Sequence, residues 1–329
     1  MPQAPPRSIR NHAEIAETYC RDVLSGTIPA CKWVRAACQR QADDLANQGS
    51  GRWLYEPSKG SKVCKFTELL RHVKGPKAGK PIRLEPWQIF ILMTVFSWVS
   101  RETGKRRFRR VYLECPKGQG KSLWSSAVAL YMLALDGEAG AEVYSAATTR
   151  DQAKIVFGVA QQMARKSPEF CQRFGVEVST HSIHIRDTMS WFRPLASEAN
   201  SLEGVNPHFV CIDELHAHEN RSCYDNLVTA AVKRDQPLIW CITTAGSNRE
   251  GVCYEVRSYR RKSSTVSLTT TASSESFTRL TAATTGPMRS PGSKPIRTGV
   301  FPYSLTPSHR KLARPCRWPA SSQRFSRST

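Results

Sequence analysis

Acidic residues are nearly absent from the last part of the chain. Residues 258–329 hold no Asp, and Glu275 is their only acid, against 13 Lys and Arg. A nuclease that works with two metal ions needs several carboxylates close together, so this segment cannot build such a centre. The segment is rich in Ser, Thr, Arg and Pro and has no sustained helical or strand period. We therefore expect an irregular, disordered basic tail.

The chain also lacks the patterns of zinc-binding, secreted and membrane proteins. Its 11 Cys form no CxxC pair and no Cys/His cluster at zinc-ligand spacing, and the N-terminus has no apolar signal-peptide core. The longest apolar run, Trp87–Val99, is too short to cross a bilayer. We therefore expect reduced thiols, no membrane partner and a location in the cytoplasm.

The positive charge is large and unevenly distributed. The formal net charge is +21, and more than half of it lies in residues 258–329. A basic chain attracts polyanions through counterion release and long-range steering, so the composition permits a nucleic-acid partner. The length of 329 residues allows one large domain or two.

Hydrophobic periodicity predicts an α/β core in the middle of the chain. Helical patterns are predicted over 12–24, 31–47, 122–135, 150–165 and 223–233. A further amphipathic segment, 63–79, is closed by the breakers at 74–76, and residues 84–88 open a strongly apolar helix. Short buried strands are predicted between them: 109–115, 142–146, 208–212 and 238–243. Strands that alternate with helices favour a mostly parallel sheet covered by helices on both faces. We divide the chain into a small helical lead-in (1–60), this α/β domain (61–257) and the basic tail (258–329).

A phosphate-binding loop is predicted between the first strand and its helix. The segment Cys115–Ser122 reads CPKGQGKS and has the strand, loop and helix context of a Walker A motif. Three residues would turn their backbone amides toward phosphate oxygens: Gly118, Gln119 and Gly120. Lys121 would neutralise the β and γ phosphates of ATP, and the Ser122 hydroxyl would bind Mg²⁺. The first position of the motif lacks its usual glycine, and an ordinary turn before a helix is the alternative interpretation.

A second motif combines an apolar strand with two acids. The segment Phe209–Glu214 reads FVCIDE, as in a Walker B motif. Asp213 would hold Mg²⁺ through water, and Glu214 would orient or deprotonate the attacking water. A strand followed by an acidic helix cap is the alternative interpretation. His216 and His218 follow, but helical spacing would place them on different faces, so we interpret both as structural.

The third element, Ile239–Gly246, is a buried strand that ends in hydroxyls and a glycine. It comes one strand after the Walker B motif. A residue at this place could sense the γ-phosphate and transmit its loss.

These three motifs, in this order, resemble those of the large terminase subunits of tailed phages, particularly the HK97-like group. The resemblance covers roughly Trp53–Arg257 and rests on ordered blocks: 66–74, 84–88, 118–122, 145–153, 201–204, 213–216 and 243–246. It implies a P-loop NTPase fold, with Gln88 reading the adenine of ATP, Lys117 sensing or stabilising the γ-phosphate, and Glu214 as the catalytic carboxylate. Three residues match the motif that couples hydrolysis to DNA movement: Thr243, Thr244 and Gly246.

The resemblance further implies an ATP- and Mg²⁺-dependent motor that moves double-stranded DNA into a preformed viral capsid. Such an enzyme works as a homo-oligomeric ring on the portal protein, with a terminase small subunit, in the cytoplasm of the bacterial host. Large terminases continue into a nuclease domain, but the scarcity of acids after residue 257 means that we expect no endonuclease activity from this chain.

The basic tail has a specific explanation in a shift of reading frame. Residues 294–303 read KPIRTGVFPY, and codons exist for which an overlapping frame encodes KANPNWGVSV, a string similar to the family's sequence between ATPase and nuclease. We hypothesise that the tail is translated out of frame.

Two other functions are compatible with the motifs. One is a different P-loop DNA-dependent ATPase, such as a helicase-like remodeller, which a gene neighbourhood without capsid and portal genes would favour. The other is an inactive prophage remnant whose basic tail binds nucleic acid. An ATPase activity that is lost in Lys121→Ala or Glu214→Ala would count against the remnant.

Overall fold

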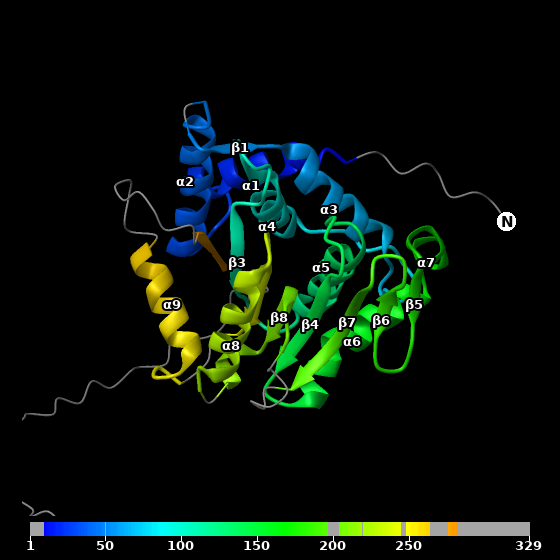
Figure 1. Ribbon diagram of the computed structural model, residues 1–329. Coiled ribbons are helices and arrows are strands. Elements are labelled where there is room, and N and C mark those ends of the chain that lie inside the picture. Colours follow the sequence, from blue (N-terminus) through cyan, green and yellow to red (C-terminus); the bar gives the residue numbers. More distant parts are fainter. Residues whose placement is uncertain are drawn as a thin grey trace, which may run out of the picture. The chain divides into compact units, whose positions relative to one another are not determined.

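Within the residues that the structure describes, eight strands form the central sheet, in the order β10-β3-β9-β8-β4-β7-β6-β5 (Figure 1). The six strands from β10 to β7 run parallel, and β6 and β5 are antiparallel to their neighbours. Their bounds are β3 (Phe108–Glu114), β4 (Glu142–Ala147), β5 (Val176–Val178), β6 (Ile183–Ile185), β7 (Ser190–Ala196), β8 (Pro207–Asp213), β9 (Leu238–Thr243) and β10 (Ser276–Thr281). The predicted, mostly parallel sheet is confirmed.

The computed structural model describes residues 10–49, 51–196, 204–218, 220–244, 248–263 and 276–281. All of these belong to one structural unit, Met1–Thr285. None of the helices within these ranges is long and apolar enough to span a bilayer.

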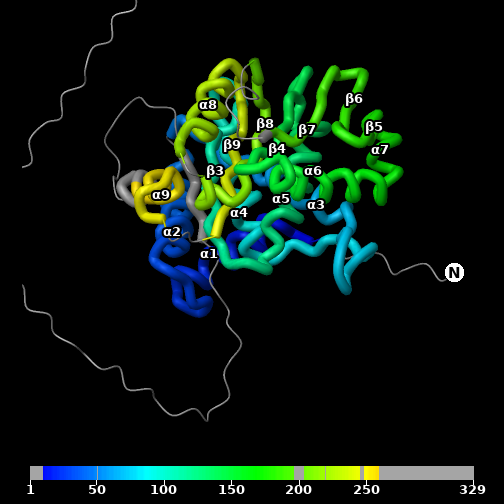
Figure 2. Tube along the Cα trace, turned by 90° about the horizontal axis from the view of Figure 1, so that it is seen from below, coloured from blue at the N-terminus to red at the C-terminus, as the bar shows by residue number. Residues whose placement is uncertain are grey.

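Helices cover both faces of the sheet, as predicted. One face carries α1 (His12–Ser25), α2 (Lys32–Ala46), α3 (Pro57–Leu69), α4 (Pro86–Ser97), α5 (Lys121–Ala134), α6 (Arg150–Arg165) and α7 (Pro168–Phe174). The other face carries the 3₁₀ turn η2 (Leu215–Ala217), α8 (Ser222–Ala230) and α9 (Val252–Ser263). Figure 2 shows α8 on one side of the strands and α1, α3, α4 and α5 on the other.

Two hydrophobic clusters result from this arrangement. Because successive side chains of a strand point to opposite faces, Trp240 of β9 joins the larger cluster, whereas Ile239 and Cys241 join the smaller one. The helices that precede residue 60 also contribute to the larger cluster, and α1 packs directly against α4. The packing is therefore continuous from α1 to the sheet.

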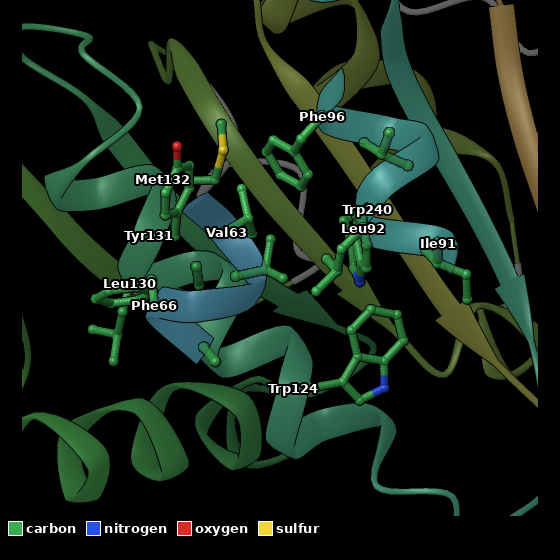
Figure 3. Close-up of a cluster of buried hydrophobic side chains, with 14 of the residues drawn as sticks. Val63, Phe66, Ile91, Leu92, Phe96, Trp124, Leu130, Tyr131, Met132 and Trp240 are labelled. Atoms are coloured by element: carbon green, nitrogen blue, oxygen red, sulfur yellow. The ribbon is translucent and has the colours of Figure 1, made fainter. Parts of the chain in front are cut away.

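Aromatic packing in the larger cluster fixes α5, the helix that follows the phosphate loop. The rings of Trp124 and Trp240 meet edge to face, with centroids 5.2 Å apart and an interplanar angle of 83° (Figure 3). The indole N–H of Trp240 donates to the hydroxyl of Ser125 at 3.0 Å, so the buried polar atom is satisfied. The first turns of α5 are thus held against β9 by an aromatic contact and a buried hydrogen bond.

Element boundaries agree best with prediction where the hydrophobic period is long. Helix α6 and strand β9 have the predicted bounds, and α2 differs from its prediction by one residue at each end. The predicted amphipathic segment 63–79 is helical only as far as Leu69, and it is not helical between Leu70 and Ile82. There the chain turns back on itself, with a bridge between Arg71 and Pro81. The helix instead begins at Pro57, a residue suited to the first turn.

Several short elements were not predicted. Strand β1 (Trp53–Tyr55) pairs with β2 (Trp98–Ser100), and β5, β6 and α7 lie at the far edge of the domain. Within the predicted tail, α9 continues to Ser263 and β10 pairs with β3. An edge strand takes its hydrogen bonds from its neighbour, so it can form without a strong period of its own. The rest of the tail lies outside the described residues, and its shifted frame stays a hypothesis.

Candidate nucleotide-binding site

The predicted motifs meet at the carboxyl edge of the sheet. Strand β9 lies between β3 and β8, so the loop after β3, the acids after β8 and the hydroxyls after β9 are neighbours. The backbone N–H of Cys115 donates to the carbonyl of Thr243 at 3.1 Å, which extends the β3–β9 pairing into the loop. Ligands of open parallel sheets bind at this edge.

The loop between β3 and α5 closes around the ammonium group of Lys121. The Nζ atom of Lys121 donates to the carbonyls of Cys115 at 2.9 Å and Pro116 at 3.3 Å, and the residue is only 7% exposed. Gly118 and Gly120 have φ angles of +84° and +69°, which an L side chain rarely adopts. These glycines therefore permit the turn that delivers the chain to the first turn of α5.

The start of α5 has the features of an anion-binding site. The first amides of a helix have no intrahelical partner and carry a partial positive charge, and here Lys121 adds a full one. Ser122 and Gln119 are partly exposed, and Lys117 is exposed on the loop. This arrangement can bind phosphate oxygens.

Asp213 and Glu214 place two carboxylates beside this loop. Asp213 is 6% exposed, and its Oδ1 accepts the backbone N–H of Glu214 at 2.8 Å. Burial and the nearby charge of Glu214 raise the pKa of Asp213 to about 6, although that N–H, Lys121 and a hydrogen bond with Ser122 oppose the rise. Ser122 and Asp213 are thus brought together, as their predicted shared metal would require.

The donor set suits Mg²⁺. No cluster of three or more His, Cys, Asp or Glu that could hold a metal by itself occurs in the part of the chain that the structure describes. Mg²⁺ usually takes one or two protein oxygens and fills its shell with waters and substrate phosphates. Asp213 and Ser122 fit that role, because a divalent cation would relieve the repulsion that raises the pKa of Asp213.

Glu214 and the end of β9 are both contacted by His216, a residue that we interpreted from the sequence as structural. His216 Nδ1 lies 3.1 Å from Glu214 Oε2 and 3.0 Å from Thr243 Oγ1. The segment after Glu214 is a 3₁₀ turn rather than the helix that we assumed. The sequence shows Glu214, His216 and Thr243 in this order. It does not show that His216 contacts Thr243, because the two residues are 27 positions apart.

Comparison with known proteins identifies the family of this chain. A family model described as "Terminase large subunit, ATPase domain" matches residues 86–262, just over half of the chain. The chain belongs to this family. The predicted resemblance is therefore confirmed.

The relatives of this terminase ATPase domain are longer proteins. It is 22% identical to the large terminase subunit of Enterobacteria phage HK97 over 195 residues, 58% of this chain and 38% of that protein. It is 46% identical to protein YmfN of Escherichia coli K12 over 55 residues, 17% of this chain and 12% of that protein. The crystal structure of the HK97 large terminase has the same fold: the TM-score is 0.54 at 21% identity, with 63% and 42% of the two chains covered.

Three predicted site residues of the terminase domain remain: Gln88, Thr244 and Gly246. Gln88 is 8% exposed in the first turn of α4, and its Oε1 accepts the backbone N–H of Glu85 at 2.9 Å. Its neighbour Trp87 packs edge-on against Trp124, three residues after Lys121. Thr244 Oγ1 lies 3.4 Å from His216 Nδ1. Gly246 lies outside the described residues.

Proposed function

We propose that this chain binds ATP with Mg²⁺ and hydrolyses the terminal phosphate, and that this reaction drives double-stranded DNA into a viral capsid. The observation that carries the proposal is the meeting of Lys121, Asp213 and Glu214 at one edge of the sheet. Phosphoryl transfer depends mainly on positioning and on compensation of charge, and these residues supply both.

Each side chain has one part in the reaction. Lys121 and the amides of residues 118–120 bind the phosphates, and Lys117 stabilises charge that develops on the γ-phosphate. Ser122 and Asp213 hold Mg²⁺, which when bound neutralises phosphate charge. Glu214 orients the attacking water and accepts its proton. Gln88 presents its remaining amide group to the adenine.

The coupling part of the proposal concerns the end of β9. Thr243 and Thr244 lie one strand from the acids, and Gly246 follows them in the sequence. We propose that this segment transmits loss of the γ-phosphate to the DNA-moving parts. Membership of the terminase family favours packaging over a helicase-like function.

The assembly follows from the same proposal. The partners are double-stranded DNA, a terminase small subunit and the portal protein, with the chain in a homo-oligomeric ring. The site of action is the cytoplasm of the bacterial host, with transient attachment to the procapsid portal. We propose no cleavage of DNA by residues 258–329, because they hold a single acid.

Phosphate release and nucleotide binding by the full chain test the hydrolysis. We expect Glu214→Gln to keep ATP affinity and to lower kcat by about 10²-fold or more, the usual contribution of a general base. Lys121→Ala should weaken ATP binding as well. Glu177→Gln and Lys65→Ala, which change exposed residues of the same types, should behave like the natural sequence. Hydrolysis that is equally fast in Glu214→Gln would refute the proposed chemistry.

A further inference from the structure

His216 makes two contacts with the candidate site through one atom. Its Nδ1 lies 3.1 Å from Glu214 Oε2 and 3.0 Å from Thr243 Oγ1. Its backbone N–H donates to the same Thr243 hydroxyl at 3.1 Å. The imidazole therefore spans the gap between the acid that follows β8 and the last residue of β9.

The hydrogen atoms in this group can be assigned from its contacts. The Thr243 hydroxyl donates its proton to the carbonyl of Thr244 at 2.9 Å, so it acts as an acceptor toward His216. A lone pair on Nδ1 would face the Glu214 carboxylate oxygen and repel it. Nδ1 therefore carries the proton and donates to Thr243, with Glu214 Oε2 within ion-pair distance of the same nitrogen.

The Glu214 carboxylate has few other constraints. Its Oε2 atom is buried, and no conventional hydrogen-bond donor to it is found among the described residues, although His216 lies within ion-pair distance. The backbone of Glu214 has a φ of +47°, unusual for a residue with a side chain, and is held by the N–H bond to Asp213. The backbone is thus fixed by Asp213, whereas the carboxylate lies within ion-pair distance of His216.

We propose that His216 is a positioning residue. It holds the Glu214 carboxylate in the orientation needed for the attacking water and makes that orientation depend on Thr243 at the end of β9. This inference rests on the proposed hydrolysis of ATP. It adds a direct connection between the general base and the segment that couples hydrolysis to movement.

Steady-state kinetics of the full chain test this role. We expect His216→Ala to lower kcat about ten- to hundred-fold, the usual effect of losing a group that orients another, while KM for ATP changes less than about two-fold. His216→Asn places an amide N–H near the position of Nδ1 and should restore most of kcat. His216→Gln reaches the position of Nε2 instead and should not. Rescue by Asn but not Gln is a pattern that a merely structural role would not produce.

Two further variants sharpen the kinetic test. His184 contacts Glu177 at 3.2 Å at the far edge of the sheet, so His184→Ala removes a similar His–Glu pair and should leave kcat unchanged. Thr243→Val and His216→Ala should be non-additive in kcat, because each breaks the same connection. An unchanged kcat in His216→Ala, with hydrolysis intact in the natural sequence, would overturn the positioning role and leave the proposed function standing.

Nitrogen NMR of the imidazole groups gives a test that does not depend on activity. The full chain contains eight His, and the signal of His216 is assigned by its loss in His216→Asn. We expect the proton on Nδ1, and we expect Glu214→Ala to shift this signal. A proton on Nε2 alone would overturn the inference whether or not the chain hydrolyses ATP, whereas absence of hydrolysis with the expected tautomer would count against the proposed function only.

Discussion

Buried charges gather at both edges of the sheet, and the two groups differ in how those charges are paired. At the amino edge, Arg106 binds both oxygens of Asp136 at 2.9 and 3.2 Å, and His208 contacts the same carboxylate at 2.9 Å. At the carboxyl edge, Asp213 lies beside a second acid, Glu214. Both aspartates are at least nine-tenths shielded from solvent, with side-chain exposure of 7% for Asp136 and residue exposure of 6% for Asp213.

The pKa values of these aspartates shift in opposite directions. Burial opposes the charge of Asp136, but Arg106 and His208 outweigh it and lower its pKa below the ordinary value. Burial and Glu214 raise the pKa of Asp213 to about 6. Burial alone therefore does not distinguish a structural acid from a functional one. The sign of the neighbouring charge does, because like charges held together are suited to a cation that the protein itself does not supply.

Breaking the amino-edge pair should have the largest effect on stability. Arg106→Leu leaves Asp136 buried without its guanidinium partner, and the loss of one member of a buried pair costs about 3–5 kcal/mol. Urea unfolding of the full chain measures this. The double variant Arg106→Leu/Asp136→Leu should recover much of the loss, since it removes the uncompensated charge. A loss below about 1 kcal/mol in the single variant would show that the pair contributes little.

The contrast between the edges also marks what the sequence could predict. Local patterns were enough for α6 and β9, whose hydrophobic periods are unbroken, and for the glycines and acids of the two nucleotide motifs. The family resemblance followed from the order of those motifs. In each case the signal lies within a short segment, where periodicity or spacing constrains the backbone directly.

Contacts between distant segments were not predictable in this way. Asp136 is 30 residues from Arg106 and 72 residues from His208, and no local pattern brings the three together. The three-residue strand β6 depends on pairing with β7, and β5 depends on pairing with β6, rather than on a period of their own. The link from His216 to Thr243 requires both the 3₁₀ turn and the adjacency of β8 and β9.

Neutralising Asp213 at the carboxyl edge should stabilise the fold, whereas Arg106→Leu destabilises it. The expected change in the free energy of unfolding is of intermediate size. Because the folded-state pKa of Asp213 is about 6 and its ordinary value is 3.8, the folded state binds this proton more tightly. The charged form therefore costs stability above about pH 6, and the cost disappears as the pH falls from 6 toward 3.8. Asp213→Asn should raise the free energy of unfolding by about 1–3 kcal/mol at pH 8 without nucleotide or metal.

Urea unfolding at pH 8 and at pH 5 measures that gain, which should shrink at the lower pH. Asp187→Asn, a change to an exposed aspartate, serves as the control and should show neither the gain nor its pH dependence. The same Asp213→Asn protein should hydrolyse ATP poorly. Equal or lower stability at pH 8 would mean that the acid pair is not a source of repulsion in the free protein.

Removing an exposed charge should have the smallest effect on the free energy of unfolding. Arg221 connects α8 and α9 through Asp225, at 3.0 Å, and Glu255, but its side chain is 52% exposed. Solvent screens such pairs, so Arg221→Ala should cost less than about 1 kcal/mol, and less still at 1 M salt. The measurement is urea unfolding at low and high salt. If Arg221→Ala cost as much as Arg106→Leu, burial would not matter, and pairing alone would determine how much a charged group stabilises this fold.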